Sequence, residues 1–392
     1  MRNNRLTIAN GIAVLAGVLT LGLAGTAFAL HDGGVAHCDA CHSMHQSPDN
    51  PISGTPNNQL LKGSDPSSTC LNCHAGGGSY HIFSTDASSL TPGGDFFWLT
   101  KSYTNVVRGN PVTSLPDNMG HNVIAGDYGL LVDGTNAVSP GGAYPSSDLY
   151  CTSCHDPHGR VNGGTENGQL PISVSGSYGA VPVAGTIAGN YRLLADDQYT
   201  TSGGWGAAAI TAPAPIAVAG VGFAFGETDT NHPAYGTGMA EWCASCHGLY
   251  INDTHRHPSG STEFLNGQAT NYNSYVRTGD FTGQQATAFT ALVQFERQET
   301  DKTLLAADTT STAGPDATDT VICLTCHRAH ASAFNNITRW DTEQELLADS
   351  TPNAANLVSM GALPNSAYYG RVITTEFGDF QRSLCNKCHV KD

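Results

Sequence analysis

The sequence predicts a chain that is mostly coil or loop, with short helices and few short strands, and three observations lead to this prediction. Forty-five glycines and 19 prolines make up about 16% of the 392 residues, against an average of about 12%. Charged residues make up only 13%, about half of their usual share. Six copies of the motif Cys-x-x-Cys-His are spread along the chain and use all twelve cysteines. Such a chain is poor in long helices and strands, so something other than packed helices and sheets must form its hydrophobic core.

The six motifs indicate what forms this core. Two thiols about one helical turn apart can add to the two vinyl groups of a porphyrin, and the adjacent histidine then lies under the iron. Disulfides or four-thiolate zinc sites are the alternatives, but neither requires a histidine directly after every pair. We therefore predict six haem c groups. The predicted attachment residues are Cys38, Cys41, Cys70, Cys73, Cys151, Cys154, Cys243, Cys246, Cys323, Cys326, Cys385 and Cys388. The predicted proximal iron ligands are His42, His74, His155, His247, His327 and His389.

These groups are expected to scaffold the fold. With about 60 residues per haem, the porphyrins themselves form most of the predicted core of this multihaem cytochrome c. Each motif is expected to lie on a short helical turn. Without the haems we expect no stable fold, as in other small domains that depend on a cofactor.

The N-terminus predicts export. Two arginines precede a mostly apolar stretch from residue 8 to residue 23, and Ala27-Phe28-Ala29 fits a cleavage site. We predict a signal peptide over residues 1–29 and a single hexahaem domain over residues 30–392. The apolar stretch is shorter than the roughly 20 residues that a membrane span needs. We expect a secreted protein, exported through the periplasm to the outer cell surface or beyond.

Charge and a second apolar stretch restrict the partners. The predicted mature chain has 15 basic and 33 acidic side chains, a net charge of −18 that makes nucleic acid a poor partner. Residues 207–225 carry no charge, but prolines and glycines interrupt them. Because proline inside a helix costs about 3 kcal/mol, we predict a buried loop or short strands there.

Three further elements are predicted along the chain. Residues 95–107 combine aromatic and β-branched side chains, which favours a hairpin or an edge strand. Thr282 and Gln285 resemble a capping box before a helical apolar face that ends at Glu296. Asp341 and Gln344 repeat that start signal and predict another helix.

Ten histidines outside the motifs supply candidate distal ligands. Three of them, His45, His158 and His330, follow a motif histidine by three positions. Such a residue lies on the same side of its own porphyrin, so we expect it to ligate the iron of a neighbouring haem; a hydrogen bond to a propionate is the alternative. The other candidates are His121, His81, His257 and His31. We expect His37, His232 and His255 to be propionate partners or surface residues.

Two imidazoles per iron would leave no open position for a substrate. Imidazole pairs also give lower potentials than a His/Met pair. We therefore expect an electron-transfer protein with no catalytic residues, rather than an enzyme.

The chain resembles the OmcS-type extracellular hexahaem cytochromes over essentially all of the predicted mature sequence. The segments that carry the resemblance are residues 30–45, 151–159, 242–247, 323–331, 367–371 and 384–392. The resemblance implies sparse secondary structure and head-to-tail polymerisation into filaments, in which closely stacked bis-histidine haems form a continuous wire. An unclosed heterologous contact between copies is the geometry that produces fibres.

The resemblance also implies partners. His45 is expected to cross to the neighbouring copy and to ligate the haem of Cys323, Cys326 and His327. Electrons are expected to arrive from upstream outer-membrane or periplasmic cytochromes and to leave for extracellular metal oxides such as iron(III) oxides. A soluble monomeric shuttle and a multihaem oxyanion reductase are the alternatives. Such a reductase often carries a lysine in place of one motif histidine, whereas all six motifs here end in histidine.

Overall fold

The computed structural model describes residues 38–43, 60–77, 81–157, 189–197, 199, 210–220, 227–251 and 257–392. The predicted signal peptide lies outside the described residues, as do His31, His37, His45, His158 and His255. The boundaries predicted for the hexahaem domain stay a prediction.

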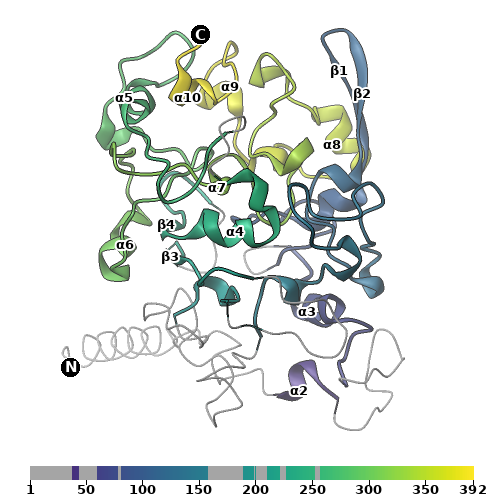
Figure 1. Cartoon of the computed structure of the whole chain (residues 1–392). Coiled ribbons are helices and arrows are strands. Elements are labelled where there is room, and N and C mark those ends of the chain that lie inside the picture. Colours follow the sequence, from purple (N-terminus) through teal and green to yellow (C-terminus); the bar gives the residue numbers. More distant parts are fainter. Residues whose placement is uncertain are drawn as a thin grey trace, which may run out of the picture.

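The described chain is mostly coil, which confirms the predicted fold class (Figure 1). It contains two small antiparallel sheets of two strands each. The longest described helices have only nine residues. The α-helices are α2 (Cys38–Cys41), α3 (Pro66–His74), α4 (Met239–His247), α5 (Gly267–Ser274), α6 (Lys302–Asp308), α7 (Cys323–Cys326), α8 (Ala354–Met360), α9 (Ile373–Glu376) and α10 (Asn386–His389). The 3-10 turns are η2 (Phe96–Thr100), η3 (Pro116–Asn118), η4 (Gly126–Tyr128), η5 (Ser146–Asp148), η6 (Cys151–Ser153), η9 (Tyr191–Leu193), η10 (Gly248–Tyr250), η11 (Gln285–Thr287), η12 (Asn335–Ile337), η13 (Leu347–Asp349) and η14 (Ser366–Tyr368).

The six motifs lie on or at the ends of short helical turns, as predicted. These turns are α2, α3, η6, α4, α7 and α10. In Figure 1, α2, α3, α4, α7 and α10 follow one another from one end of the molecule to the other. The chain therefore sets out its motifs in sequence order along the long direction of the molecule.

The predicted hairpin forms over part of its expected range. Strand β1 (Tyr103–Val107) pairs with β2 (Asn110–Ser114) in antiparallel register, with Tyr103 opposite Ser114. Arg108 and Gly109 both have positive φ, at 49° and 83°, which suits the tight turns that join two hairpin strands. The aromatic segment before the hairpin is the turn η2, because the Asp95 carboxylate accepts a hydrogen bond from the Phe97 amide at 2.9 Å and begins a helical turn.

The prediction of a helix after Thr282 is wrong. Only η11 forms there, and the residues up to Glu296 are irregular. Both partners of the apparent capping box are engaged elsewhere: the Thr282 hydroxyl donates to Asp280 at 2.7 Å, and the Gln285 amide donates to Asp316 at 2.7 Å. The apolar side chains of this segment are nevertheless buried.

The prediction of a helix after Asp341 is also wrong. The Asp341 carboxylate accepts hydrogen bonds from the amides of Glu343 at 2.8 Å and Gln344 at 3.3 Å, as an N-cap does. Its second oxygen accepts the Thr351 amide at 2.9 Å. This long-range bond turns the chain back, and only η13 follows.

The uncharged stretch behaves as predicted where it is described. Residues 210–220 contain the short strand β3 (Ile216–Val218), which pairs with β4 (Ala234–Thr237). Ala214, Ala217 and Val218 are buried. In the described residues no helix is both long enough and apolar enough to cross a membrane.

The largest core cluster runs through most of the described chain, from Leu71 near the second motif to Leu384 near the sixth. It contains two fully buried tryptophans, Trp98 and Trp340. A fully buried arginine, Arg339, also lies in the interior. A buried arginine needs partners to offset its lost hydration, and Arg339 has them in Glu227 and in backbone carbonyls.

Candidate haem-binding sites

Three motif histidines each face a second imidazole. His247 faces His121 with ring centroids 5.9 Å apart, and His155 faces His330 at 6.3 Å. His389 faces His257 at 6.0 Å. Two metal–imidazole bonds of about 2 Å each, together with the distance from each nitrogen to its ring centre, require a separation close to these values. The chain thus holds three pairs of rings at the spacing of a bis-histidine iron.

The tautomers of these rings suit metal binding. Nδ1 lies against a backbone carbonyl oxygen in both partners of the first pair: the Ala329 oxygen is 2.7 Å from His121, and the Pro140 oxygen is 2.7 Å from His247. The same contact occurs at His155, His257 and His327, with the carbonyls of Arg192 (2.9 Å), Pro258 (3.2 Å) and Asn336 (2.7 Å). A carbonyl only accepts, so Nδ1 carries the proton and Nε2 keeps its lone pair for a metal.

Burial keeps two of the distal candidates neutral. Burial, and then the nearby His247 ring, lower the pKa of His121 to about 4. Burial likewise lowers the pKa of His330 to about 3, with a smaller effect from His155. Metal-binding imidazole must be deprotonated at the ligating nitrogen, so both rings are ready to bind at neutral pH.

Glycines make room for two distal candidates. A Cβ at Gly93 would lie 2.6 Å from Nδ1 of His330, and a Cβ at Gly76 would lie 3.2 Å from the His81 ring. The Nδ1 atoms of His81 and His330 are buried and have no hydrogen-bond partner among the described residues. The observed rings and their cradles therefore fit a group that binds imidazole.

The other predicted ligands are not part of the three facing pairs. His81 lies beside the second motif, where the Ile82 amide donates to the His74 carbonyl at 2.9 Å. His327 faces no imidazole of the described residues at the spacing of the three pairs. The ligand roles of His42, His74, His81 and the other candidates stay predictions.

Consecutive motifs bring their cysteines near one another. A hydrogen bond to Cys151 raises the pKa of the Cys70 thiol, and one to Cys323 raises the pKa of the Cys243 thiol. Electrostatic effects on the pKa reach Cys70 from Cys41, Cys154 from Cys246, and Cys326 from Cys385 and Cys388. Each motif therefore lies near the next one along the chain.

The eleven cysteines described with their side chains are all free. The disulfide alternative is therefore wrong for these residues. Within the described ranges, no group of three or more His, Cys, Asp or Glu side chains is arranged as a metal-ion site.

His232 is not the surface residue or propionate partner that we expected. It is only 4% exposed, and its ring stacks on Phe289 at 3.8 Å. Its Nδ1 lies 2.9 Å from the Pro233 carbonyl oxygen, and its Nε2 lies 3.0 Å from that of Ser311. Neither nitrogen points to a cofactor site, so His232 is a packing residue.

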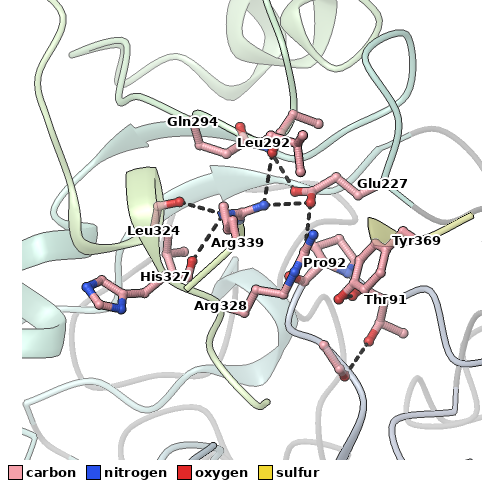
Figure 2. Close-up of polar contacts among 12 residues, drawn as sticks. Thr91, Pro92, Glu227, Leu292, Gln294, Leu324, His327, Arg328, Arg339 and Tyr369 are labelled. Carbon is pink, nitrogen blue, oxygen red and sulfur yellow. Dashed lines mark hydrogen bonds and ion pairs between the residues drawn. The ribbon is translucent and has the colours of Figure 1, made fainter. Parts of the chain in front are cut away.

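Sequence analysis missed a buried ionic cluster beside the fifth motif (Figure 2). The Glu227 carboxylate accepts hydrogen bonds from Arg339 at 2.6 Å and Arg328 at 2.9 Å through one oxygen, and from Gln294 at 2.8 Å through the other. The Arg328 guanidinium also stacks on Tyr369, 3.6 Å from the ring centroid. Only the position of Arg328, directly after His327, could have drawn attention to it in the sequence.

Comparisons with known proteins identify close relatives. No family model matches the chain. It is 41% identical to the C-type cytochrome OmcS of Geobacter sulfurreducens over 93% of this chain and 95% of that protein. A cryo-EM structure of the OmcS nanowires from the same organism matches with a TM-score of 0.77 and 39% identity, covering 92% of this chain and all of that one. A structure of the outer membrane cytochrome S filament matches with a TM-score of 0.75, 38% identity and the same coverage.

Proposed function

Because the chain belongs to the OmcS-type family of c-type cytochromes, we propose that it is the subunit of an extracellular filament that conducts electrons through six haems. It is an electron-transfer protein rather than an enzyme. Each haem, when bound, supplies a reversible one-electron couple. The twelve motif cysteines anchor the porphyrins, and the six motif histidines hold one face of each iron.

The observation that carries this proposal is the set of three facing imidazole pairs, with ring centroids 5.9–6.3 Å apart. We assign His121 to the iron of the fourth motif, His330 to that of the third and His257 to that of the sixth. Histidine on both faces of the iron leaves no coordination position for a substrate. The coordination geometry also changes little when the iron changes its oxidation state. This arrangement favours electron transfer over oxyanion reduction.

The closeness of consecutive motifs supports a continuous path. From the first motif to the sixth, cysteines of each motif influence the pKa of cysteines in the next, so neighbouring porphyrins are expected to lie close together. His45 then extends the path by ligating the fifth haem of the next copy. His31, His81 and His158 remain as candidate ligands for the first and second motifs.

The remaining parts of the proposal rest on the family and on the sequence. We propose that upstream outer-membrane or periplasmic cytochromes deliver the electrons and that iron(III) oxides or other extracellular acceptors remove them. The predicted signal peptide over residues 1–29 supports export through the periplasm.

Electron microscopy of His45→Ala and His37→Ala preparations tests the proposal. We expect His37→Ala to form filaments like the wild type. His45→Ala is expected to give monomers in which one haem in six is five-coordinate and binds carbon monoxide after reduction. Filaments of normal length from His45→Ala would rule out the bond between copies, and a wild type that stays monomeric would identify the soluble shuttle instead.

A further inference from the structure

The cluster beside the fifth motif carries an unbalanced charge. Arg328, Arg339 and Glu227 have side chains that are 3%, 0% and 1% exposed. Burial alone would raise the pKa of Glu227, but Arg339 and Arg328 outweigh it and lower that pKa, so the carboxylate is ionised. Arginine stays protonated in proteins. Two cations and one anion leave a net charge of +1, and the fourth member, Gln294, is neutral.

This charge is tied directly to the backbone of the fifth motif (Figure 2). Nε of Arg339 donates to the Leu324 carbonyl at 2.7 Å and to the His327 carbonyl at 3.1 Å. Arg328 follows His327 in the chain, and its Nη1 donates to the Pro92 carbonyl at 3.0 Å. The Arg339 guanidinium is therefore fixed at the backbone of the proximal ligand, and the Arg328 guanidinium is held beside it through their shared partner Glu227.

The cluster would act on a haem iron by repulsion between like charges. The Arg339 side chain is 0% exposed and donates to the His327 carbonyl at 3.1 Å. An oxidised haem iron carries one more positive charge than a reduced one. A buried positive charge beside the motif would therefore disfavour the oxidised iron that His327 would hold, because charges interact strongly in surroundings of low dielectric.

We propose that the buried cluster of Arg328, Glu227 and Arg339 raises the reduction potential of the haem held by Cys323, Cys326 and His327. Arg328 and Arg339 favour the less positive, ferrous state, while Glu227 limits the size of the effect. The electron that reduces the fifth haem would come from an adjacent haem, which would be oxidised. The cluster thereby tunes the haem to which His45 of the next copy is expected to bind, and the inference rests on the proposed haem at this motif.

Two substitutions distinguish an effect on the reduction potential of the fifth haem from a purely structural role of the cluster. Glu227→Gln keeps the size of the side chain and removes the negative charge, so the net charge rises to +2. Arg328→Gln removes a positive charge, so the net charge falls to zero. A cluster with only a structural role would not shift the potential in opposite directions in these two variants.

The measurement is spectroelectrochemical titration of fully loaded wild-type and variant protein. The titration curve is the sum of one-electron steps, one component for each haem. In His327→Met the component that changes its potential is that of the fifth haem. We expect that component to move to higher potential in Glu227→Gln, to move to lower potential in Arg328→Gln, and to return toward the wild type in Arg328→Lys. The matched control is Arg297→Gln, because Arg297 pairs with Asp308 and Asp319 rather than with this cluster; it is expected to leave the component in place.

A fifth-haem potential that stays unchanged or falls in Glu227→Gln would overturn the inference. That variant decides the question alone if Arg328→Gln does not fold. A failure of the proposed function would look different, because wild-type protein lacking the fifth haem would show a mass short by one haem and one missing component.

Discussion

The hydrogen bonds of the ring nitrogens decide which histidines of this chain can bind a metal. His121 is half-buried and His232 is buried, yet only His121 has one nitrogen bound to a carbonyl while its ring faces a motif imidazole. In His232 both nitrogens lie at hydrogen-bonding distance from carbonyl oxygens. The sequence analysis placed His121 among the candidate ligands and His232 outside them, and the hydrogen bonds give the physical reason for the difference.

His121→Ala tests this distinction. Loss of the imidazole that faces His247 should leave one haem in six five-coordinate, because the methyl group of alanine cannot reach the iron. We expect about one carbon monoxide molecule to bind per chain after reduction, measured from the absorption spectrum. His232→Gln is the control and should bind almost none. Equal binding by the two variants would show that His121 is not a ligand.

Helix α4 shows how a distant side chain supports a motif. The Glu296 carboxylate accepts hydrogen bonds from the amides of Gly238 and Met239, both at 3.1 Å, and so caps the helix that ends at His247. Burial raises the pKa of Glu296 to about 7, although these bonds oppose the shift. The carboxyl group therefore changes its charge near neutral pH.

This shift predicts how stability depends on pH. Between pH 4.5, the ordinary pKa of a glutamate, and about pH 7, the folded chain keeps the Glu296 proton while the unfolded chain has released it. The folded state binds more protons there, so its stability falls as pH rises through this range. The full shift corresponds to about 3 kcal/mol.

Glu296→Gln should remove this part of the pH dependence. We expect thermal unfolding midpoints measured from pH 4.5 to pH 8 to fall less steeply for this variant than for the wild type. Glu345→Gln serves as the control because Glu345 is 70% exposed, and it should follow the wild-type curve. A Glu296→Gln curve parallel to that of the wild type would refute the burial argument.

The two helices that did not form show the limit of local signals. Thr282 and Asp341 both carry side chains that can start a helix. Thr282 and Gln285 bond instead to Asp280 and Asp316, and the second carboxylate oxygen of Asp341 accepts the Thr351 amide. Helix propensity is a weak preference that tertiary contacts override. The burial of Phe289, Leu292 and Val293 was nevertheless predictable, because apolar side chains are buried whatever the backbone does.

At the scale of the whole molecule, the motifs hold together a chain with little regular structure. The helices are too short to be stable alone, and each described sheet has only two strands. The energy of folding must therefore come largely from the attached haems.

The chain produced in cells without cytochrome c maturation should consequently stay unfolded. We expect a coil-like circular dichroism spectrum and rapid proteolysis, because the short helices and two-stranded sheets are not stable without the attached haems. The same chain produced with the maturation system is the control and should resist the protease. A protease-resistant chain without haem would show that the polypeptide folds unaided.

The sequence by itself determined the cofactor, the number of sites, the coil-rich fold and the electron-transfer chemistry, because covalent attachment and axial ligation require particular residues at fixed local spacing. Only the tertiary structure decided which distal histidines face the third, fourth and sixth motifs, that His232 is a packing residue, and that Glu227 lies between Arg328 and Arg339. These contacts join residues that are far apart in the chain. Their partners are chosen by packing and by the burial of charge, which no local spacing encodes.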